Sequence, residues 1–289
     1  MKFLLSLLTL TLITFNSFAQ KDFQGKATYM SKTTMDMSRF DQVPEARKKQ
    51  IMARMKNFLE KTYTLSFTKT ASTFKEDAKL DAPGASNGGG RGFASSTGQG
   101  SIYKNSTDKK IIEDIETFSK RFLIIEKMNT LKWELGSETK QIGQYTCYKA
   151  TLTREDNTID YANIFGRRGR GGRNNNNEEK KDSTETTKKE VDTPKMETIT
   201  AWYTPQIPVS TGPKDYYGLP GLILEINSGR TTILCTEIVL NPNEKIEIKE
   251  PKKGKKVSRE EYNEIVKEKT EELQEQFRAR RNNGGGRRF

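Results

Sequence analysis

The sequence predicts an α+β fold: a curved, mostly antiparallel sheet that forms an open half-barrel, with one helix near the N-terminus and one at the C-terminus. Short runs of alternating apolar and polar residues recur along the chain, separated by brief polar turns. This pattern favours an antiparallel meander over βαβ units. Two segments, 41–61 and 258–281, instead carry apolar residues at helical spacing. Many short strands with one apolar face tend to curl, which favours the half-barrel.

The N-terminal 19 residues have the features of an export signal. Lys2 precedes a short apolar run at 3–13, and small residues at Ser17 and Ala19 predict cleavage between Ala19 and Gln20. The run is shorter than the roughly 20 residues that a membrane-spanning helix needs. We therefore expect export to the periplasm or the cell exterior, a soluble chain after cleavage, and no transmembrane segment.

The exported part begins with an alternating strand at 23–30, followed by the first helix at 41–61. Asp41 is the expected N-cap, and Pro44 is tolerated in the first turn. The apolar stripe of this helix should face the sheet, and it consists of Ile51, Met52, Met55, Phe58 and Leu59.

Ten further strands are predicted within one domain at 20–257. The runs are 63–68, 72–76, 101–105, 110–115, 122–126, 131–135, 144–153, 197–203, 222–226 and 231–240. Two segments interrupt the pattern. Residues 81–100 are rich in Gly, Ser and Ala and predict a flexible loop. Residues 166–194 contain Val191 as their only large apolar residue, so this basic insertion cannot offset its ordering entropy and should be disordered.

The C-terminal helix has a clear start signal. Ser258 followed by Glu261 forms a capping box, which places the helix at 258–281. A narrow apolar stripe that includes Tyr262 and Val266 runs along an otherwise charged surface. Residues 282–289 are expected to form a disordered tail.

Composition limits the chemistry. The chain has 50 basic and 38 acidic residues, a formal net charge of +12, and no histidine. The absence of histidine excludes Ser-His-Asp and Cys-His nucleophiles and removes the commonest zinc ligand. We therefore expect a non-enzymatic protein without a cofactor or metal.

Two cysteines, Cys147 and Cys235, lie in strand-like runs. Exported cysteine pairs usually oxidise, and a bridge between these two would close a loop of roughly 90 residues and contribute about 4 kcal/mol. A Cys147–Cys235 disulfide is the first expectation. Two buried thiols on unrelated strands are the alternative.

The most informative stretch is 212–226, GPKDYYGLPGLILEI. Pro220 and Gly221 suit the second and third positions of a type II turn. The following run, 222–226, is apolar on both sides and predicts a strand covered on both faces. A turn that leads into a central strand is the favoured interpretation, and the lip of a ligand site is the alternative.

These residues resemble a known family. The hexapeptide at 218–223 is the signature of the GLPGLI family of exported, uncharacterised proteins of Gram-negative bacteria. Segments 143–150 and 201–208, together with Gly212, Pro213 and Tyr217, match the same pattern, and the likeness extends from 23 to about 262. The family has no established catalytic residues, and the 166–194 insertion departs from its pattern. By looser analogy, the order of elements resembles the half-barrel of periplasmic lipoprotein carriers.

Two functions follow as the main hypotheses, and an enzyme with unusual, histidine-free chemistry is a third and lesser alternative. The first is a cell-envelope protein that binds a hydrophobic ligand, such as lipid, or an outer-membrane partner in the sheet concavity, lined by Trp133, Tyr148, Trp202, Tyr217, Leu222 and Leu224. The second is an adaptor that binds envelope polyanions through Arg-Gly segments, with Arg167, Arg168, Arg170 and Arg173 as candidates. The export signal argues against nucleic acid as the partner. For the basic insertion itself, a solvated loop that binds nothing specific is the favoured interpretation.

Overall fold

The computed structural model describes residues 23–35, 38, 41–78, 100–155 and 196–283. Several predictions fall outside these residues: the signal peptide 1–19 with its cleavage site at Ala19 and Gln20, most of the loop 81–100, the insertion 166–194 with its four candidate arginines, and the end of the tail, 284–289.

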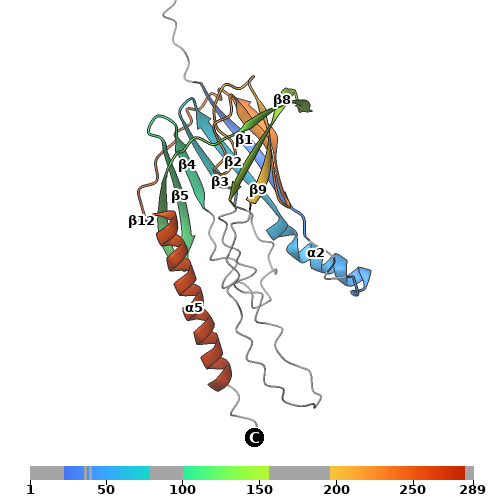
Figure 1. Ribbon diagram of the computed structural model, residues 1–289, viewed down its shortest axis with the longest axis vertical. Coiled ribbons are helices and arrows are strands. Elements are labelled where there is room, and N and C mark those ends of the chain that lie inside the picture. The colour runs from blue at the N-terminus through green and yellow to red at the C-terminus, as the bar shows by residue number, and fades with distance from the viewer. Residues whose placement is uncertain (1–22, 36–37, 39–40, 79–99, 156–195, 284–289) are drawn as a thin grey trace, which may run out of the picture.

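The described residues form one open sheet of twelve strands (Figure 1). The strands lie side by side in the order β12-β6-β5-β4-β3-β2-β1-β11-β10-β9-β8-β7, and every neighbouring pair is antiparallel except β12 and β6. The predicted fold class is therefore confirmed. The bounds are β1 (Gln24–Thr33), β2 (Glu60–Thr68), β3 (Ala71–Glu76), β4 (Ser101–Asn105), β5 (Lys110–Thr117), β6 (Lys120–Lys127), β7 (Glu134–Ile142), β8 (Tyr145–Glu155), β9 (Met196–Thr204), β10 (Leu222–Ser228), β11 (Thr231–Leu240) and β12 (Lys255–Val257).

The two strands at the edges of the sheet differ from the prediction. The strand expected at 131–135 is instead β7, which begins at Glu134, and β12 was not predicted. Nearly every residue of β7 is exposed, so the strand has no buried face and no apolar alternation to reveal it. Leu131 and Trp133 precede this strand and pack against the core.

The hydrophobic core lies between the sheet and the segment 205–221, which we call the strap. Ile207, Val209, Tyr216 and Leu219 of the strap are all buried. They belong to one cluster with residues of β1, β2, β3 and β8 to β11. The strap therefore occupies the inner face of the sheet, where the sequence predicted an open concavity.

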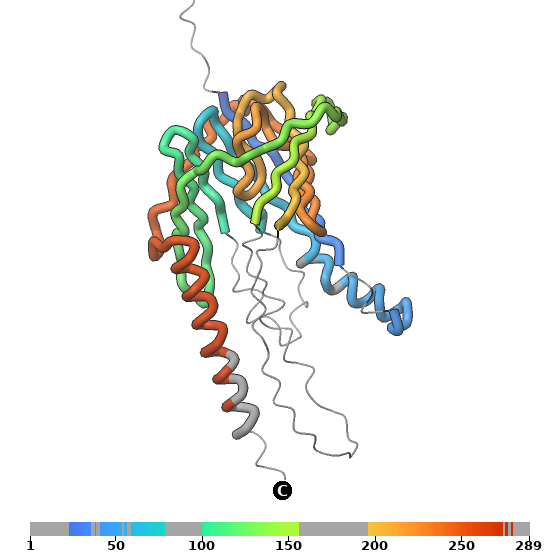
Figure 2. The backbone as a smooth tube through the Cα atoms, viewed as in Figure 1, coloured from blue at the N-terminus to red at the C-terminus, as the bar shows by residue number. Residues whose placement is uncertain are grey.

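The first helix, α2 (Glu45–Leu59), does not cover the sheet as predicted. It begins after Pro44 instead of Asp41, without a side-chain cap, and β2 follows it at Glu60 with no turn between them. The helix projects away from the sheet (Figures 1 and 2), and none of its residues belongs to a described core cluster. The strap already fills the face on which the helix was expected to pack.

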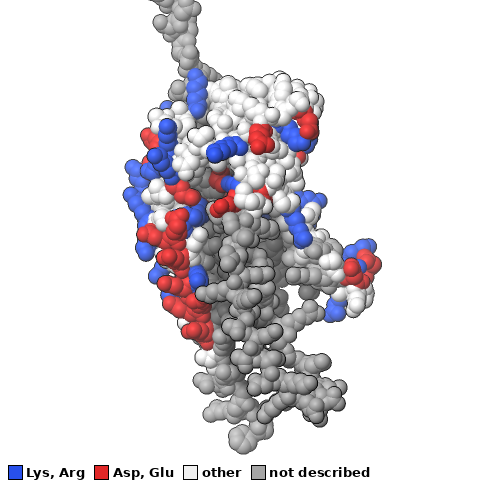
Figure 3. All heavy atoms as spheres, in the orientation of Figure 1, with Lys and Arg blue, Asp and Glu red and all other residues white. Residues whose placement is uncertain are grey.

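The second helix, α5 (Arg259–Asn283), starts as predicted and runs two residues further. In the capping box, the Ser258 N–H donates to Glu261 Oε2 at 2.9 Å, and the Glu261 N–H donates to Ser258 Oγ at 3.2 Å. Tyr262 and Val266 pack against Phe122 of β6. Acidic side chains lie along the rest of the helix (Figure 3). Among the described residues, no helix combines the length and apolar character needed to cross a bilayer.

Candidate functional site

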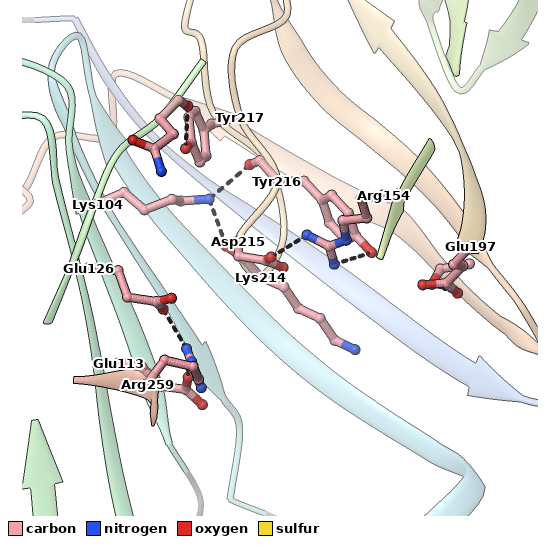
Figure 4. Close-up of polar contacts among 12 residues, drawn as sticks. Lys104, Glu113, Glu126, Arg154, Glu197, Lys214, Asp215, Tyr216, Tyr217 and Arg259 are labelled. Atoms are coloured by element: carbon pink, nitrogen blue, oxygen red, sulfur yellow. Dashed lines mark hydrogen bonds and ion pairs between the residues drawn. The ribbon is translucent and has the colours of Figure 1, made fainter. Parts of the chain in front are cut away.

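The most unusual polar group of the inner face is Lys104 on β4. Its Nζ donates to the carbonyl oxygen of Gly212 at 2.6 Å. It also donates to the carbonyl oxygens of Lys214 at 2.8 Å and Tyr216 at 3.0 Å (Figure 4). Three acceptors are the full complement for an ammonium group. The side chain is buried, and burial lowers the pKa of Lys104 to about 7, although Asp215 acts in the opposite direction.

A second anchor of the strap comes from β8. Arg154 Nη1 lies 2.6 Å from Asp215 Oδ2, and the guanidinium stacks over the Tyr216 ring, 4.9 Å from its centroid. Burial opposes ionisation of Asp215, but the charge of Arg154 outweighs it and lowers the pKa of the carboxyl. On β3, Ser72 Oγ bonds Thr211 Oγ1 at 2.8 Å. Strands from distant parts of the sheet therefore hold the strap.

Two predicted aromatic residues complete this network. Trp133 Nε1 donates to the Tyr217 carbonyl at 2.8 Å, and Tyr217 OH donates to the Asn129 carbonyl at 2.6 Å. The Trp133 ring also packs on Tyr216, with the centroids 6.4 Å apart. The segment before β7 is thereby fastened to the end of the strap.

The strap network has the character of a structural anchor. The cavity beside Lys104 measures about 20 Å³, which is room for about one water molecule. The Lys104 amine points at three carbonyls, so a substrate cannot reach it without displacing the strap. Within the described residues, no group of three or more Cys, Asp and Glu side chains could hold a metal ion.

The six predicted lining residues do not form one surface. Leu222 and Leu224 are fully buried in the core, so a ligand cannot contact them unless the strap moves. Tyr148 is 38% exposed and packs on Tyr203, its partner across β8 and β9. Trp202 precedes Tyr203 and so faces the opposite side of the sheet, where the Lys140 ammonium lies 5.3 Å from its ring centroid. Leu222 and Leu224 share the core cluster against which Trp133 and Trp202 pack, and Trp133 and Tyr217 are joined by a hydrogen bond.

The two cysteines are free thiols, so the expected bridge is absent and the alternative of two buried thiols holds in this structure. Two strands lie between β8, with Cys147, and β11, with Cys235, which separates them by roughly 14 Å along the sheet. Disulfide-bonded Cα atoms lie within about 7 Å. Burial raises the pKa of Cys147 to about 11 and that of Cys235 to about 12.

We predict that neither thiol reacts with a thiol-specific reagent in the native protein, because both are buried and protonated at neutral pH. Unfolding in denaturant without reductant should release two reactive thiols per chain. Quantitative thiol titration checks this. A count of zero in denaturant that rises to two after reduction would instead demonstrate a disulfide.

A second candidate site lies at the opposite edge of the sheet from β7. A shallow cavity of about 620 Å³ is lined by Arg121, Lys249, Glu250, Lys252 and Lys253, and we call it the basic cavity. Gly254 lets the loop approach β6, because a Cβ at this position would lie 3.1 Å from the Arg121 carbonyl oxygen. Basic side chains gather along this edge of the molecule (Figure 3).

The charges of the basic cavity do not cancel. Arg121 makes a two-point contact with Asp114, and Lys110 bonds Glu250 and lowers its pKa. Lys249 Nζ lies 2.8 Å from Glu247 Oε1. Lys252 and Lys253 are exposed, and the exposed Lys255 and Lys256 of β12 follow them. After the paired charges are set aside, the cavity keeps a surplus of positive charge.

Comparisons with known proteins found a family model and solved structures that are similar to this chain. Residues 133–225 match a family model described as a protein of unknown function, Porph_ging. A search of curated proteins found no match. Two crystal forms of PNGF-II resemble the chain at 10% identity, with TM-scores of 0.46 and 0.45 over 84% of this chain. The chain spans about a third of the length of those structures.

The residues that anchor the strap escaped sequence analysis. Lys104, Arg154 and Asp215 come from segments far apart in the chain. Asp215 lies in the conspicuous stretch 212–226, but nothing in that stretch indicates a contact with Lys104 or Arg154. The basic cavity left a partial signal, because the run of lysines at 252–256 is visible in the sequence. The contribution of Arg121 depends on the parallel pairing of β12 with β6, which the sequence does not reveal.

Proposed function

We propose that this chain is an exported, non-enzymatic protein of the cell envelope that binds a polyanionic envelope component at the basic cavity. The observation that carries the proposal is the surplus of positive charge that the exposed Lys252 and Lys253 give this cavity after the ion pairs of Arg121 and Lys249 are set aside. The matching family model brings no activity that would compete with this proposal.

The chemistry of the cavity suits a polymer better than a small molecule. Exposed lysines hold their charges on long flexible side chains, and a shallow cavity buries little of a small ligand. A polymer with repeated acidic groups gains from several weak contacts at once. Because exposed charges are screened by salt, this binding should be strong only at low ionic strength.

Two further observations support a non-enzymatic role. The sequence has no histidine to serve as a general base near neutral pH. The most strongly shifted lysine, Lys104, is enclosed by backbone carbonyls. The hypothesis of a hydrophobic ligand in the concavity has less support, because the strap fills the inner face of the sheet.

The test is retention on an immobilised acidic polysaccharide in a salt gradient. The double variant Lys252→Glu and Lys253→Glu should elute at a clearly lower salt concentration, because four units of charge change at the cavity. The control is Arg47→Glu with Lys49→Glu on α2, which changes the net charge by the same amount and should elute close to the unmodified protein.

If both double variants eluted at equally lowered salt concentrations, retention would follow net charge, and binding at the basic cavity would be refuted. Deletion of 166–194 provides a second comparison. If that deletion abolishes retention and the lysine variant does not, the Arg-Gly insertion is the binding segment and the cavity is not.

A further inference from the structure

Helix α2 is strongly basic and carries one apolar stripe. Among its 15 residues, Glu45 is the single acid, against five basic residues: Arg47, Lys48, Lys49, Arg54 and Lys56. The apolar residues follow helical spacing and are Ile51, Met52, Met55, Phe58 and Leu59. This combination is typical of helices that lie in the interface of a bilayer.

The described members of this stripe, Ile51, Met52, Met55 and Leu59, belong to none of the described core clusters. The helix projects from its junction with β2 (Figures 1 and 2), and no α2 residue belongs to a described core cluster. Met52 is 37% exposed, and Arg47 and Lys49 are exposed as well. Apolar and basic side chains are therefore both available on an element that stands apart from the sheet.

We propose that α2 binds the surface of an anionic lipid bilayer. The apolar stripe would enter the boundary between headgroups and acyl chains, and the basic side chains would contact the lipid phosphates. Charge complementarity favours this partner, because each basic residue near an anionic leaflet strengthens binding about fivefold. A helix of 15 residues is about 22 Å long, so it would lie along the surface and bind reversibly.

The direct connection of α2 to the sheet would fix the orientation of the protein on the membrane. Glu60 is the first residue of β2, and its backbone N–H donates to the Lys56 carbonyl at the end of the helix. Because no linker separates α2 from β2, the helix cannot swing freely. A helix lying on a membrane would hold the sheet in a defined orientation above it.

The experiment is co-sedimentation of the purified protein with vesicles of phosphatidylglycerol and phosphatidylcholine, compared with vesicles of phosphatidylcholine alone. We expect binding to the anionic vesicles only. Arg47→Glu with Lys49→Glu should weaken the partition coefficient by at least about tenfold, since two favourable charges become repulsive. Met52→Asp should also weaken it, because the apolar stripe loses its exposed member.

The matched control is Lys69→Glu with Lys245→Glu, two exposed positions outside both α2 and the basic cavity, which changes the net charge by the same amount and should keep vesicle binding within about twofold. Thermal unfolding of each variant verifies that the sheet is intact. Equal loss in both double variants, equal binding to neutral vesicles, or no binding at all would overturn the proposal. The proposal would also be wrong if the variant with Arg47→Glu and Lys49→Glu lost its retention on the acidic polysaccharide but still bound vesicles as the unmodified protein does. Because retention and vesicle binding are measured separately, this proposal can fail while the basic cavity stands.

Discussion

Replacing Gly221 by alanine is expected to lower the free energy of unfolding by about 4 kcal/mol or more. A Cβ at this position would lie 2.1 Å from the Thr204 carbonyl oxygen and 2.8 Å from the Pro205 nitrogen. Both atoms belong to the backbone, so no side-chain rotation can relieve the overlap. Gly221 closes the strap and leads directly into β10.

The surroundings of Gly221 cannot move away at low cost. Thr204 is fully buried at the end of β9 and pairs with Leu222 of β10. The Leu222 N–H also donates to the Ile207 carbonyl at 3.0 Å, which joins the two ends of the strap. A shift that made room for a methyl group would therefore separate β9 from β10 and loosen the strap.

The control for this prediction is Gly143→Ala in the β7–β8 turn. Gly143 has a φ of +57°, but a Cβ there would meet no heavy atom within 4 Å. Its substitution should cost only about 1 to 2 kcal/mol, from backbone strain. Denaturant unfolding compares the two variants, and soluble yield replaces it if the Gly221 variant does not fold. Equal effects would contradict the proposed overlap.

The hexapeptide at 218–223 shows which features of a turn the local sequence predicts and which it does not. Pro220 and Gly221 predicted a turn, and a turn is present, but it is not of type II. Gly221 has a φ of +158°, and its N–H donates to the Leu219 carbonyl at 2.8 Å, which makes a three-residue turn around Pro220. The glycine is needed because β9 passes close to it, and that contact depends on the folded sheet.

The strands show the same division between local and non-local information. The predicted bounds of β4 and β11 agree with the structure, because each is an alternating run between turn residues. The edge strands β7 and β12 could not be located by apolar alternation, since β7 is exposed along nearly its whole length and β12 has three residues. Composition therefore does not reveal which short segments pair at the edges of the sheet.

The strap is the largest feature that sequence analysis missed. Lys104 lies in the run SIYKN, where a lysine in an alternating strand is normally expected to face solvent. It is buried because carbonyl groups of residues more than a hundred positions away surround its ammonium group. The residue pattern within either segment does not predict that contact. Because the sequence does not reveal that the strap packs on the inner face of the sheet, an open concavity for a ligand was predicted there.

Lys104→Met is expected to lower the free energy of unfolding by about 3 kcal/mol near pH 7. Methionine keeps the length and apolar character of the side chain but has no hydrogen to donate. Three carbonyls, the buried ones of Gly212 and Tyr216 and the partly buried one of Lys214, would lose their shared donor. Each unsatisfied buried group costs about 1 to 3 kcal/mol, partly offset because a lysine no longer has to be buried.

The stabilising contribution of Lys104 should increase with pH. Burial lowers the pKa of the folded lysine from 10.5 to about 7. Between these values the unfolded chain holds a proton that the folded chain has released, so unfolding takes up a proton. The free energy of unfolding therefore rises with pH, by at most about 1.4 kcal/mol per unit. The methionine variant lacks this titration, so its deficit relative to the unmodified protein should widen from pH 7 to pH 9.

Denaturant unfolding of both proteins at pH 7, 8 and 9 measures this deficit directly. Subtracting one curve from the other cancels the titration of the tyrosines and cysteines that the two proteins share. Lys75→Met, at an exposed position on the neighbouring strand β3, should change stability by no more than about 0.5 kcal/mol at every pH. A deficit for Lys104→Met that stayed constant or narrowed with pH would mean that the buried lysine keeps its proton, and that the carbonyls around it outweigh its desolvation.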